Sequence, residues 1–308
     1  MRQNSFRFVC LLFGLSFLGG EMKAQQKSAH ETGLRSKSTS ELAELEQVIT
    51  KVNYDESKVP VYTLPDVLTL TNGRKVTTKK EWVEKRRPEL LRLFETQIYG
   101  KAPVRSKDLH FRLLNEDREA LGGLATRKEV AVYFTKDEKH YLTVLMYLPN
   151  RRKGTVPMFF GINFKGNHAI HPDEGITFPS EERMIAYGRK RMFPRGSAAS
   201  RWPVEMLMEH GYGLATFYRG DIDPDFDDGF QNGVHPLYYK KGQTRPAEDE
   251  WGTLAAWAWG MSCAMDYFET DKDIDAKRIA IFGHSRLGKT TLWALSLIHI
   301  SEPTRLRR

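Results

Sequence analysis

The chain has 308 residues, of which 40% are hydrophobic and 28% charged, a balance typical of a globular protein and not of a disordered or fibrous one. The formal net charge is +8, but residues 1–24 and 295–308 each contribute +2, and the remaining +4 includes no basic run that would indicate nucleic-acid binding. Only two cysteines occur, Cys10 and Cys263, so the sequence carries neither a disulfide framework nor zinc-ligand spacing.

Residues 1–24 have the pattern of a secretory signal peptide. Arg2 and Arg7 come before or at the start of an apolar run over residues 8–20, and Ala24 is a small residue at the expected cleavage point. The alternative is a membrane anchor, but the run is too short to span a bilayer as a stable helix. We therefore expect a secreted or periplasmic protein without stable membrane association, with a flexible polar leader over residues 25–53.

From residue 54 onward, strand and helix patterns alternate. A helix is expected to start near Pro88, because proline suits the first turn of a helix. The remaining elements are read from apolar periodicity and turn residues. Strands are predicted at 109–114, 128–134, 141–148, 156–162, 213–218 and 278–282, and helices at 200–210 and 251–268. This alternation is typical of a parallel α/β sheet.

One segment fits two unrelated catalytic motifs: Gly283-His284-Ser285-Arg286-Leu287-Gly288-Lys289-Thr290. As G-x-x-x-x-G-K-[ST] it is a phosphate-binding Walker A loop, and read around Ser285 it is a nucleophile elbow, a sharp turn between a strand and a helix. The secretion signal and the late position in the domain favour the elbow, because a secreted protein meets almost no ATP. We predict an α/β-hydrolase three-layer sandwich with a mostly parallel sheet, the elbow on a central strand, and no cofactor.

Residues 295–305 match, without a break, the translation of a transposase mosaic end and adapter used to prepare DNA sequencing libraries. We therefore expect residues 295–308 to be a non-native tail, and residues 54–294 to be the N-terminal part of a catalytic domain truncated after the elbow helix. In α/β-hydrolases an acid and a late histidine follow the serine. Here only Glu302 and His299 follow, and at 1.5 Å per residue His299 would lie roughly 21 Å along the helix from Ser285. The 308-residue chain is thus expected to be inactive.

The motif G-x-S-R-x-G-K from Gly283 to Lys289 resembles the elbow of the glucuronoyl esterases, carbohydrate esterase family 15, and of its bacterial members in particular. The resemblance covers residues 54–294, with specific stretches at 62–66, 86–91, 98–100, 161–168, 220–239 and 251–252. Fungal members carry a disulfide-bonded cysteine before the serine, where this chain has His284, so that bridge is absent.

The resemblance implies a role for each polar residue of the elbow. Ser285 is expected to be the nucleophile, Arg286 to stabilise the oxyanion, and Lys289 to bind the sugar hydroxyls of a uronate. The implied reaction is hydrolysis of the ester between 4-O-methylglucuronic acid side chains of xylan and lignin alcohols. Glucuronoxylan and lignin–carbohydrate esters are then the expected partners.

Two further functions stay open: an esterase for acetyl or feruloyl groups of xylan, and an inactive hydrolase-fold fragment. The positive charge of Lys289 near the acyl group favours a uronate over a neutral acyl chain.

No metal site is expected. The acidic run 221–229 lacks the glycine and glutamate of a calcium-binding loop, and His168 and His171 lack a third ligand. His168 is expected to contribute to the pocket as a loop residue. Trp257, Trp259 and Cys263 are expected in the core.

Overall fold

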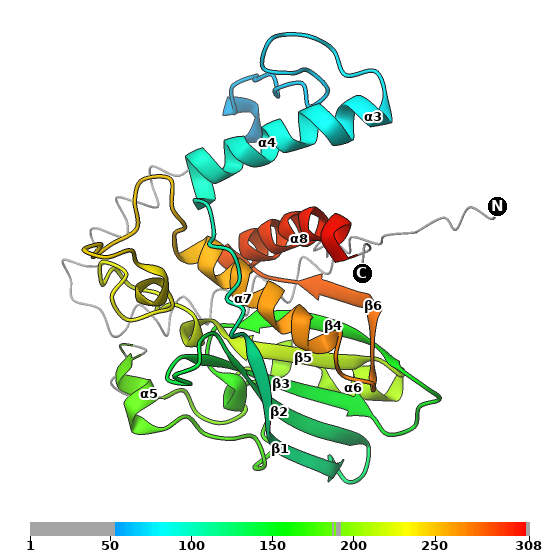
Figure 1. The fold of residues 1–308 in the computed structure, drawn as a ribbon. Coiled ribbons are helices and arrows are strands. Elements are labelled where there is room, and N and C mark those ends of the chain that lie inside the picture. Colours follow the sequence, from blue (N-terminus) through cyan, green and yellow to red (C-terminus); the bar gives the residue numbers. More distant parts are fainter. Residues whose placement is uncertain (1–52, 187, 189–191, 306–308) are drawn as a thin grey trace. The chain divides into compact units, whose positions relative to one another are not determined.

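The computed structural model describes residues 53–186, 188 and 192–305 (Figure 1). The expected signal peptide and residues 25–52 of the expected leader lie outside these residues, as do residues 306–308. The chain divides into two units, Met1–Asp66 and Val67–Arg308. The described part of the first unit is extended apart from one 3₁₀ turn, η1 (Glu56–Lys58). None of the helices within the described ranges is long and apolar enough to cross a membrane.

The second unit contains a six-stranded sheet in the order β1-β2-β3-β5-β4-β6. The strands are β1 (His110–Ala120), β2 (Ala125–Tyr133), β3 (Tyr141–Pro149), β4 (Val156–Asn163), β5 (Gly213–Tyr218) and β6 (Ile274–Phe282). All six lie where the sequence predicts strands, although β1 and β6 are longer than expected.

The prediction of a mostly parallel sheet is wrong, because the sheet is mixed. β1, β2, β3 and β5 pair antiparallel, while β4 pairs parallel with both β5 and β6. The first three strands are joined by short turns, which permit only antiparallel neighbours. The three parallel strands are joined by longer connections that contain helices, as parallel pairing requires.

The elbow strand β6 lies at an edge of the described sheet and not at its centre, which corrects a second expectation. Within the described part of the chain β6 pairs only with β4, and the residues that follow it form a helix. The exposed fraction of Phe282, at the end of β6, is 38%.

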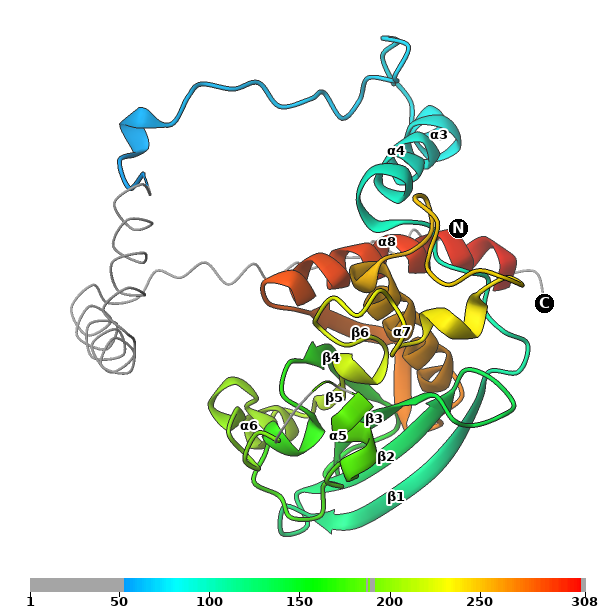
Figure 2. The same ribbon diagram turned by 90° about the vertical axis from the view of Figure 1, so that its left-hand side faces the viewer.

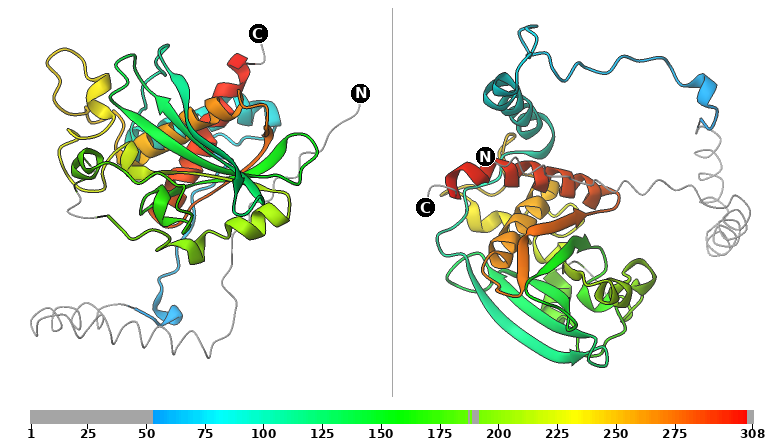
Figure 3. Two further views of the ribbon diagram at one scale, coloured as in Figure 1. Left: turned by 90° about the horizontal axis from the view of Figure 1, so that it is seen from below. Right: turned by 90° about the vertical axis from the view of Figure 1, so that its right-hand side faces the viewer.

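Helices cover both faces of the sheet, which gives the predicted three layers. α7 (Thr253–Phe268) and α8 (Arg286–Arg305) lie side by side on one face, and α6 (Val204–Glu209) lies on the other (Figures 1 to 3). The larger hydrophobic cluster fills the α7 and α8 side and includes Trp257, Trp259 and Cys263, as predicted. A smaller cluster around Tyr147 and Leu214 packs under α6.

The N-terminal helical region starts earlier than predicted. It consists of α3 (Lys79–Glu81), the π-helical turn η2 (Trp82–Arg86), α4 (Arg87–Phe94) and the π-helical turn η3 (Glu95–Tyr99). The side chain of Thr78 accepts the backbone N–H of Glu81 and caps the first turn, a signal that the sequence analysis passed over in favour of Pro88. Tyr99 stacks on Trp293 of α8, with 4.5 Å between ring centroids.

The remaining short helices lie in the connections of the sheet. They are η4 (Asn167–Ala169), α5 (Glu181–Ala186), η5 (Ala199–Arg201), η6 (Arg219–Asp221) and η7 (His235–Tyr238). The helix predicted over residues 200–210 is in fact the pair η5 and α6, since Pro203 separates them.

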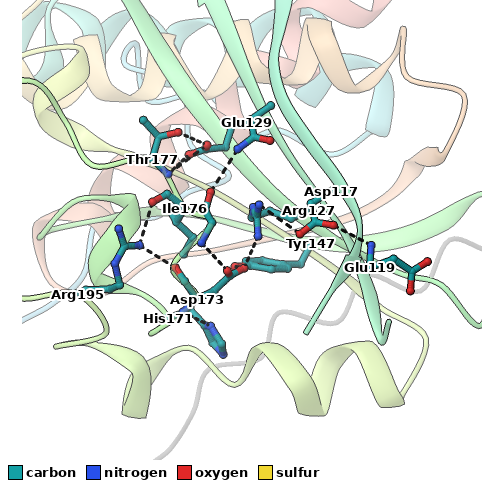
Figure 4. Close-up of polar contacts among 12 residues, drawn as sticks. Asp117, Glu119, Arg127, Glu129, Tyr147, His171, Asp173, Ile176, Thr177 and Arg195 are labelled. Carbon is teal, nitrogen blue, oxygen red and sulfur yellow. Dashed lines mark hydrogen bonds and ion pairs between the residues drawn. The ribbon is translucent and has the colours of Figure 1, made fainter. Parts of the chain in front are cut away.

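Buried charges tie the loop after η4 to the sheet (Figure 4). Arg127 on β2 contacts Asp173 at 2.7 Å, and the hydroxyl of Tyr147 on β3 donates to the same carboxylate at 2.6 Å. Burial opposes ionisation of Asp173, but these two hydrogen bonds, a third from the backbone N–H of Gly175 and the charge of Arg127 together outweigh it, so the pKa of Asp173 lies below the ordinary value. The loop that follows β4 is therefore anchored to the strands beneath it.

Candidate active site

Ser285 lies in a sharp turn between β6 and α8 and is exposed to solvent. Its φ is +56°, in the left-handed region that costs a residue with a side chain about 1–2 kcal/mol. Its carbonyl accepts the N–H groups of Gly288 at 3.0 Å and Lys289 at 3.3 Å, so the helix begins directly after it. A strained serine at this point is the backbone geometry of a nucleophile elbow, as the sequence predicts.

Glycines make the turn tight enough to hold that geometry. A Cβ on Gly283 would lie 2.4 Å from the carbonyl oxygen of Leu287, and one on Gly161 of β4 would lie 2.8 Å from the Phe282 ring. Leu287 itself is buried in the main core. The leucine thus occupies a core position, and the second glycine of the motif comes one residue later, at Gly288. A Cβ on Gly288 would lie 3.3 Å from the carbonyl oxygen of Gly283.

The carboxyl ends of β4, β5 and β6 lie at one edge of the sheet, because these strands are parallel. β4 leads into Phe164, β5 into Arg219, and β6 into Ser285. Ligands of open α/β sheets bind at such an edge. The site is therefore built from three loops that are distant in sequence.

Phe164 contacts both neighbours of the nucleophile. The guanidinium carbon of Arg286 is 5.3 Å from the centre of the Phe164 ring, a cation–π contact. The ring of His284 meets the same ring edge-on at 6.5 Å between centroids. The ring of His284 thus packs against the ring of Phe164.

Arg286 is half-exposed and its Nη2 donates to the carboxylate of Asp225. The same oxygen of Asp225 forms an ion pair with Nη2 of Arg219, at 2.9 Å. The backbone N–H of Arg286, in the first turn of α8, has no acceptor within the helix and is available to an oxyanion. Lys289 lies one turn after Ser285 and is exposed. The three residues predicted for the site, Ser285, Arg286 and Lys289, thus lie together at the N-terminus of α8.

Two buried asparagines shape the loop beside the elbow, and the sequence analysis missed both. Asn163 accepts the N–H of Gly166 at 2.8 Å and donates to Asn167 at 2.8 Å and to Thr216 at 3.1 Å. Asn167 donates in turn to the carbonyl of Thr143 at 2.8 Å. The only sign of them in the sequence is a polar amide residue, Asn163, directly after the apolar run of a predicted strand. These bonds fix the backbone around Phe164.

His168 lies in η4, in the connection that follows β4. Its side chain is fully buried, and its Nε2 is 3.0 Å from the carbonyl oxygen of Phe193. His171 is paired with Glu205 at 2.8 Å. Among the residues that the structure describes, no group of three or more His, Cys, Asp or Glu side chains is placed to hold a metal ion.

No general base is assigned to Ser285 within the described side chains. None of the histidines described there shares a hydrogen bond with its hydroxyl. His235 forms a buried pair with Asp223, 3.1 Å between Nδ1 and Oδ1, which the sequence analysis did not find. His299 lies in α8, but its side chain is outside the described set.

A pocket of about 460 Å³ lies in the segment between β5 and α7. Its lining contains none of the three predicted site residues. It consists of Phe230, Arg245, Pro246, Ala247, Glu248, Glu250, Trp251 and Gly252.

A strained serine between a parallel strand and a helix, in a three-layer sandwich, defines an α/β-hydrolase. A family model described as "Glucuronyl esterase, fungi" matches residues 206–298. "Carbohydrate esterase MZ0003" of an unknown prokaryotic organism is 50% identical over 249 residues, which are 79% of this chain and 57% of that protein. "4-O-methyl-glucuronoyl methylesterase 1" of Phanerochaete chrysosporium is 30% identical over 133 residues, 40% of this chain and 27% of that one.

Solved structures agree with the sequence relatives. The glucuronoyl esterase from Solibacter usitatus has a TM-score of 0.72 and 44% identity over 78% of this chain and 62% of its own. A promiscuous esterase of carbohydrate esterase family 15 from a marine bacterial metagenome has a TM-score of 0.67 and 49% identity over 79% and 62%. Over 78–79% of its length the chain is therefore similar to esterases of carbohydrate esterase family 15, among them glucuronoyl esterases. It spans about three fifths of the length of these relatives.

Proposed function

We propose that this protein is a secreted serine esterase that cleaves esters between 4-O-methylglucuronoyl side chains of xylan and lignin alcohols in lignocellulose. The observation that carries the proposal is the positive φ of Ser285, directly followed by Arg286 and, one turn later, by Lys289. This places a nucleophile and two cations on one helix start. The similarity to esterases of carbohydrate esterase family 15 and the name of the Phanerochaete relative support a glucuronoyl ester as substrate.

The hydroxyl oxygen of Ser285 adds to the ester carbonyl carbon while its proton passes to a general base. The charge that develops on the carbonyl oxygen is stabilised by the Arg286 side chain and by backbone N–H groups of the elbow. The bond from the carbonyl carbon to the lignin alkoxy oxygen then breaks, and the base returns the proton to the leaving alcohol. Water attacks the glucuronoyl-serine ester, which releases the uronic acid and restores Ser285.

The base and its acidic partner are assigned to a segment that follows residue 294 in the native gene. Both residues follow the serine in α/β-hydrolases, and α8 carries His299 away from the elbow. The 308-residue chain then holds the nucleophile and the oxyanion side of the site without its base.

The test compares the 308-residue chain with the product of the native gene read across the codon of Ala294. Both are assayed with benzyl and methyl glucuronate and with acetylxylan. We expect only the longer product to hydrolyse the glucuronate esters, and Ser285→Ala to lower its rate by about 10⁴-fold or more. Ser200→Ala, at another exposed serine, serves as the matched control.

Each other outcome removes a defined part of the proposal. Hydrolysis of acetylxylan alone would replace the uronate with an acetyl substrate. Ser285-dependent hydrolysis by the 308-residue chain would place the base within it. No hydrolysis by either protein would refute the esterase proposal.

Secretion is tested separately by N-terminal sequencing of the protein exported by a bacterial host. Cleavage after Ala24 is the expected result, because the apolar run before it is too short for an anchor. A protein that retains Met1 and stays with the membrane fraction would refute it.

A further inference from the structure

Asp225 joins two arginines with one carboxylate oxygen. Its Oδ2 accepts a hydrogen bond from Arg286 and forms an ion pair with Arg219, at 2.9 Å from Nη2. The two arginines differ in exposure: the Arg219 side chain is 8% exposed and the Arg286 side chain 46%. A buried cation therefore holds a carboxylate, and that carboxylate holds the exposed cation beside the nucleophile.

Arg219 has a fixed place from which to do this. It follows β5 directly in η6, and its guanidinium carbon lies 5.4 Å from the Trp257 ring and 6.0 Å from the Phe164 ring. These rings belong to α7 and to the loop after β4. The position of Arg219 is thus determined by the core and not by solvent.

The loop that carries Asp225 is also closed at its base. The N–H of Val234 donates to the carbonyl of Ile222 at 2.8 Å, and His235 pairs with Asp223 at 3.1 Å. The indole N–H of Trp257 donates to the carbonyl of Asp223 at 2.9 Å. Asp223, which lies two residues before Asp225, is therefore anchored to α7, and this limits the movement of the Asp225 carboxylate.

We propose that Asp225, itself held by Arg219, is a positioning residue for Arg286 in ester hydrolysis. It binds Nη2 of the guanidinium, and within the described part of the chain no other atom of the Arg286 side chain has a hydrogen-bond partner. The remaining N–H groups of the Arg286 guanidinium can then donate to the oxyanion. The proposal rests on the proposed esterase function.

Electrostatics agree with a positioning role. An exposed ion pair contributes little to folding, so the pair of Arg286 and Asp225 is a weak stabilising device. Its larger effect is to remove the freedom of a long side chain before the substrate arrives, which is what catalysis by preorganised charge requires. The three charges sum to a single positive charge, which leaves the cluster attractive to a developing anion.

The experiment is a double-mutant cycle between Asp225 and Arg286, carried out on the gene product that hydrolyses benzyl glucuronate. Asp225→Asn keeps the shape of the side chain and removes its charge. Asp227→Asn is the matched control on the same loop, because within the described residues Asp227 accepts only the N–H of Gly229. We expect Asp225→Asn to lower kcat by about 10- to 100-fold with KM changed less than about threefold, a part of the loss of a full oxyanion donor. Asp225→Glu should recover part of the rate.

In the cycle, Asp225→Asn should not lower kcat further once Arg286→Ala is present, because the two substitutions remove the same interaction. Additive losses, or an Asp225→Asn rate equal to that of Asp227→Asn, would overturn the proposal while leaving the esterase function intact.

A second readout does not depend on activity. Nuclear magnetic resonance of the arginine side chains of the 308-residue chain should show hindered rotation of the Arg286 guanidinium in wild type and Asp227→Asn, and free rotation in Asp225→Asn. An equally mobile Arg286 in all three proteins would refute the positioning role. If wild type shows hindered rotation while no protein hydrolyses the ester, the esterase function fails and the contact stands without a catalytic role, which also overturns the proposal.

Discussion

Phe164 lies against Arg286, with 5.3 Å between the guanidinium carbon and the ring centre. The same ring contacts His284 at 6.5 Å. The residue that follows β4 therefore supports both residues that flank Ser285, and the loop after one strand determines how the elbow after another presents its side chains.

Replacing this ring should impair catalysis more than folding. We expect Phe164→Ala to lower kcat/KM for benzyl glucuronate by about tenfold, since an exposed cation–π contact contributes about 0.5–1 kcal/mol and the ring also sets the position of His284. Phe226→Ala, at a ring that is 46% exposed, is the control. Equal rates for both variants would show that Phe164 does not support the elbow.

The strain at Ser285 predicts an unusual order of stability. Glycine normally destabilises relative to alanine, but at φ +56° alanine retains the steric cost that glycine avoids. We expect Ser285→Gly to be more stable than Ser285→Ala by about 1 kcal/mol, with both inactive. Urea denaturation measures the difference.

The control for this order is Ser200, an exposed residue in the 3₁₀ turn η5 that has no positive φ. There Ser200→Gly should be less stable than Ser200→Ala. The same order at both positions would mean that the elbow is not strained in solution.

The sequence predicts the elements around the site well, because their signals are local. The elbow is recognisable from eight neighbouring residues, and the apolar runs before and after it place β6 and α8. Strand order is not local. The mixed sheet and the edge position of β6 depend on pairings such as Leu145 with Thr216, which no periodicity indicates.

The contacts that complete the site are equally non-local. Asp225 and Arg286 are 61 residues apart, and Asn163 and Thr216 are 53 apart. The acidic run 221–229 stood out in the sequence, where the calcium interpretation failed and a loop with carboxylates near the mouth of the site was favoured, but no partner for these carboxylates could be named. Its actual partner is a cation of the protein itself, since Asp225 binds two arginines.

The elbow should not tolerate a side chain at Gly283. Its Cβ would lie 2.4 Å from the Leu287 carbonyl oxygen and 2.5 Å from the Thr291 hydroxyl, so the helix must shift from the strand. We expect Gly283→Ala to lower the free energy of unfolding by about 1–3 kcal/mol. Gly252→Ala, where the nearest atom would be 3.9 Å away, should change it by less than about 0.5 kcal/mol. Urea midpoints that match for the two variants would contradict the tight packing seen here.

Stability should fall on the acid side, and the buried ion pairs of Lys128 indicate why. Lys128 on β2 contacts Asp271 at 2.9 Å and Asp273 at 2.8 Å. Burial opposes ionisation of both carboxyls, yet hydrogen bonds from Tyr267 and Lys128 to Asp271, and from Lys128 to Asp273, hold both pKa values below the ordinary one. Lowered carboxyl pKa values contribute stability above the unfolded-state pKa, near 3.8, and that contribution is lost as the pH falls through the folded-state pKa.

We therefore expect the urea midpoint to drop as the pH is lowered below about 4, where these carboxyls begin to bind protons in the unfolded chain. Asp271→Asn should be less stable than wild type at pH 7, because it removes a partner from a buried lysine. It should also show a shallower drop in acid, because one of the groups that titrates is gone. An acid dependence of Asp271→Asn as steep as that of wild type would show that the Lys128 pairs do not govern acid unfolding, and that other carboxyls, such as Asp173 beside Arg127, dominate it.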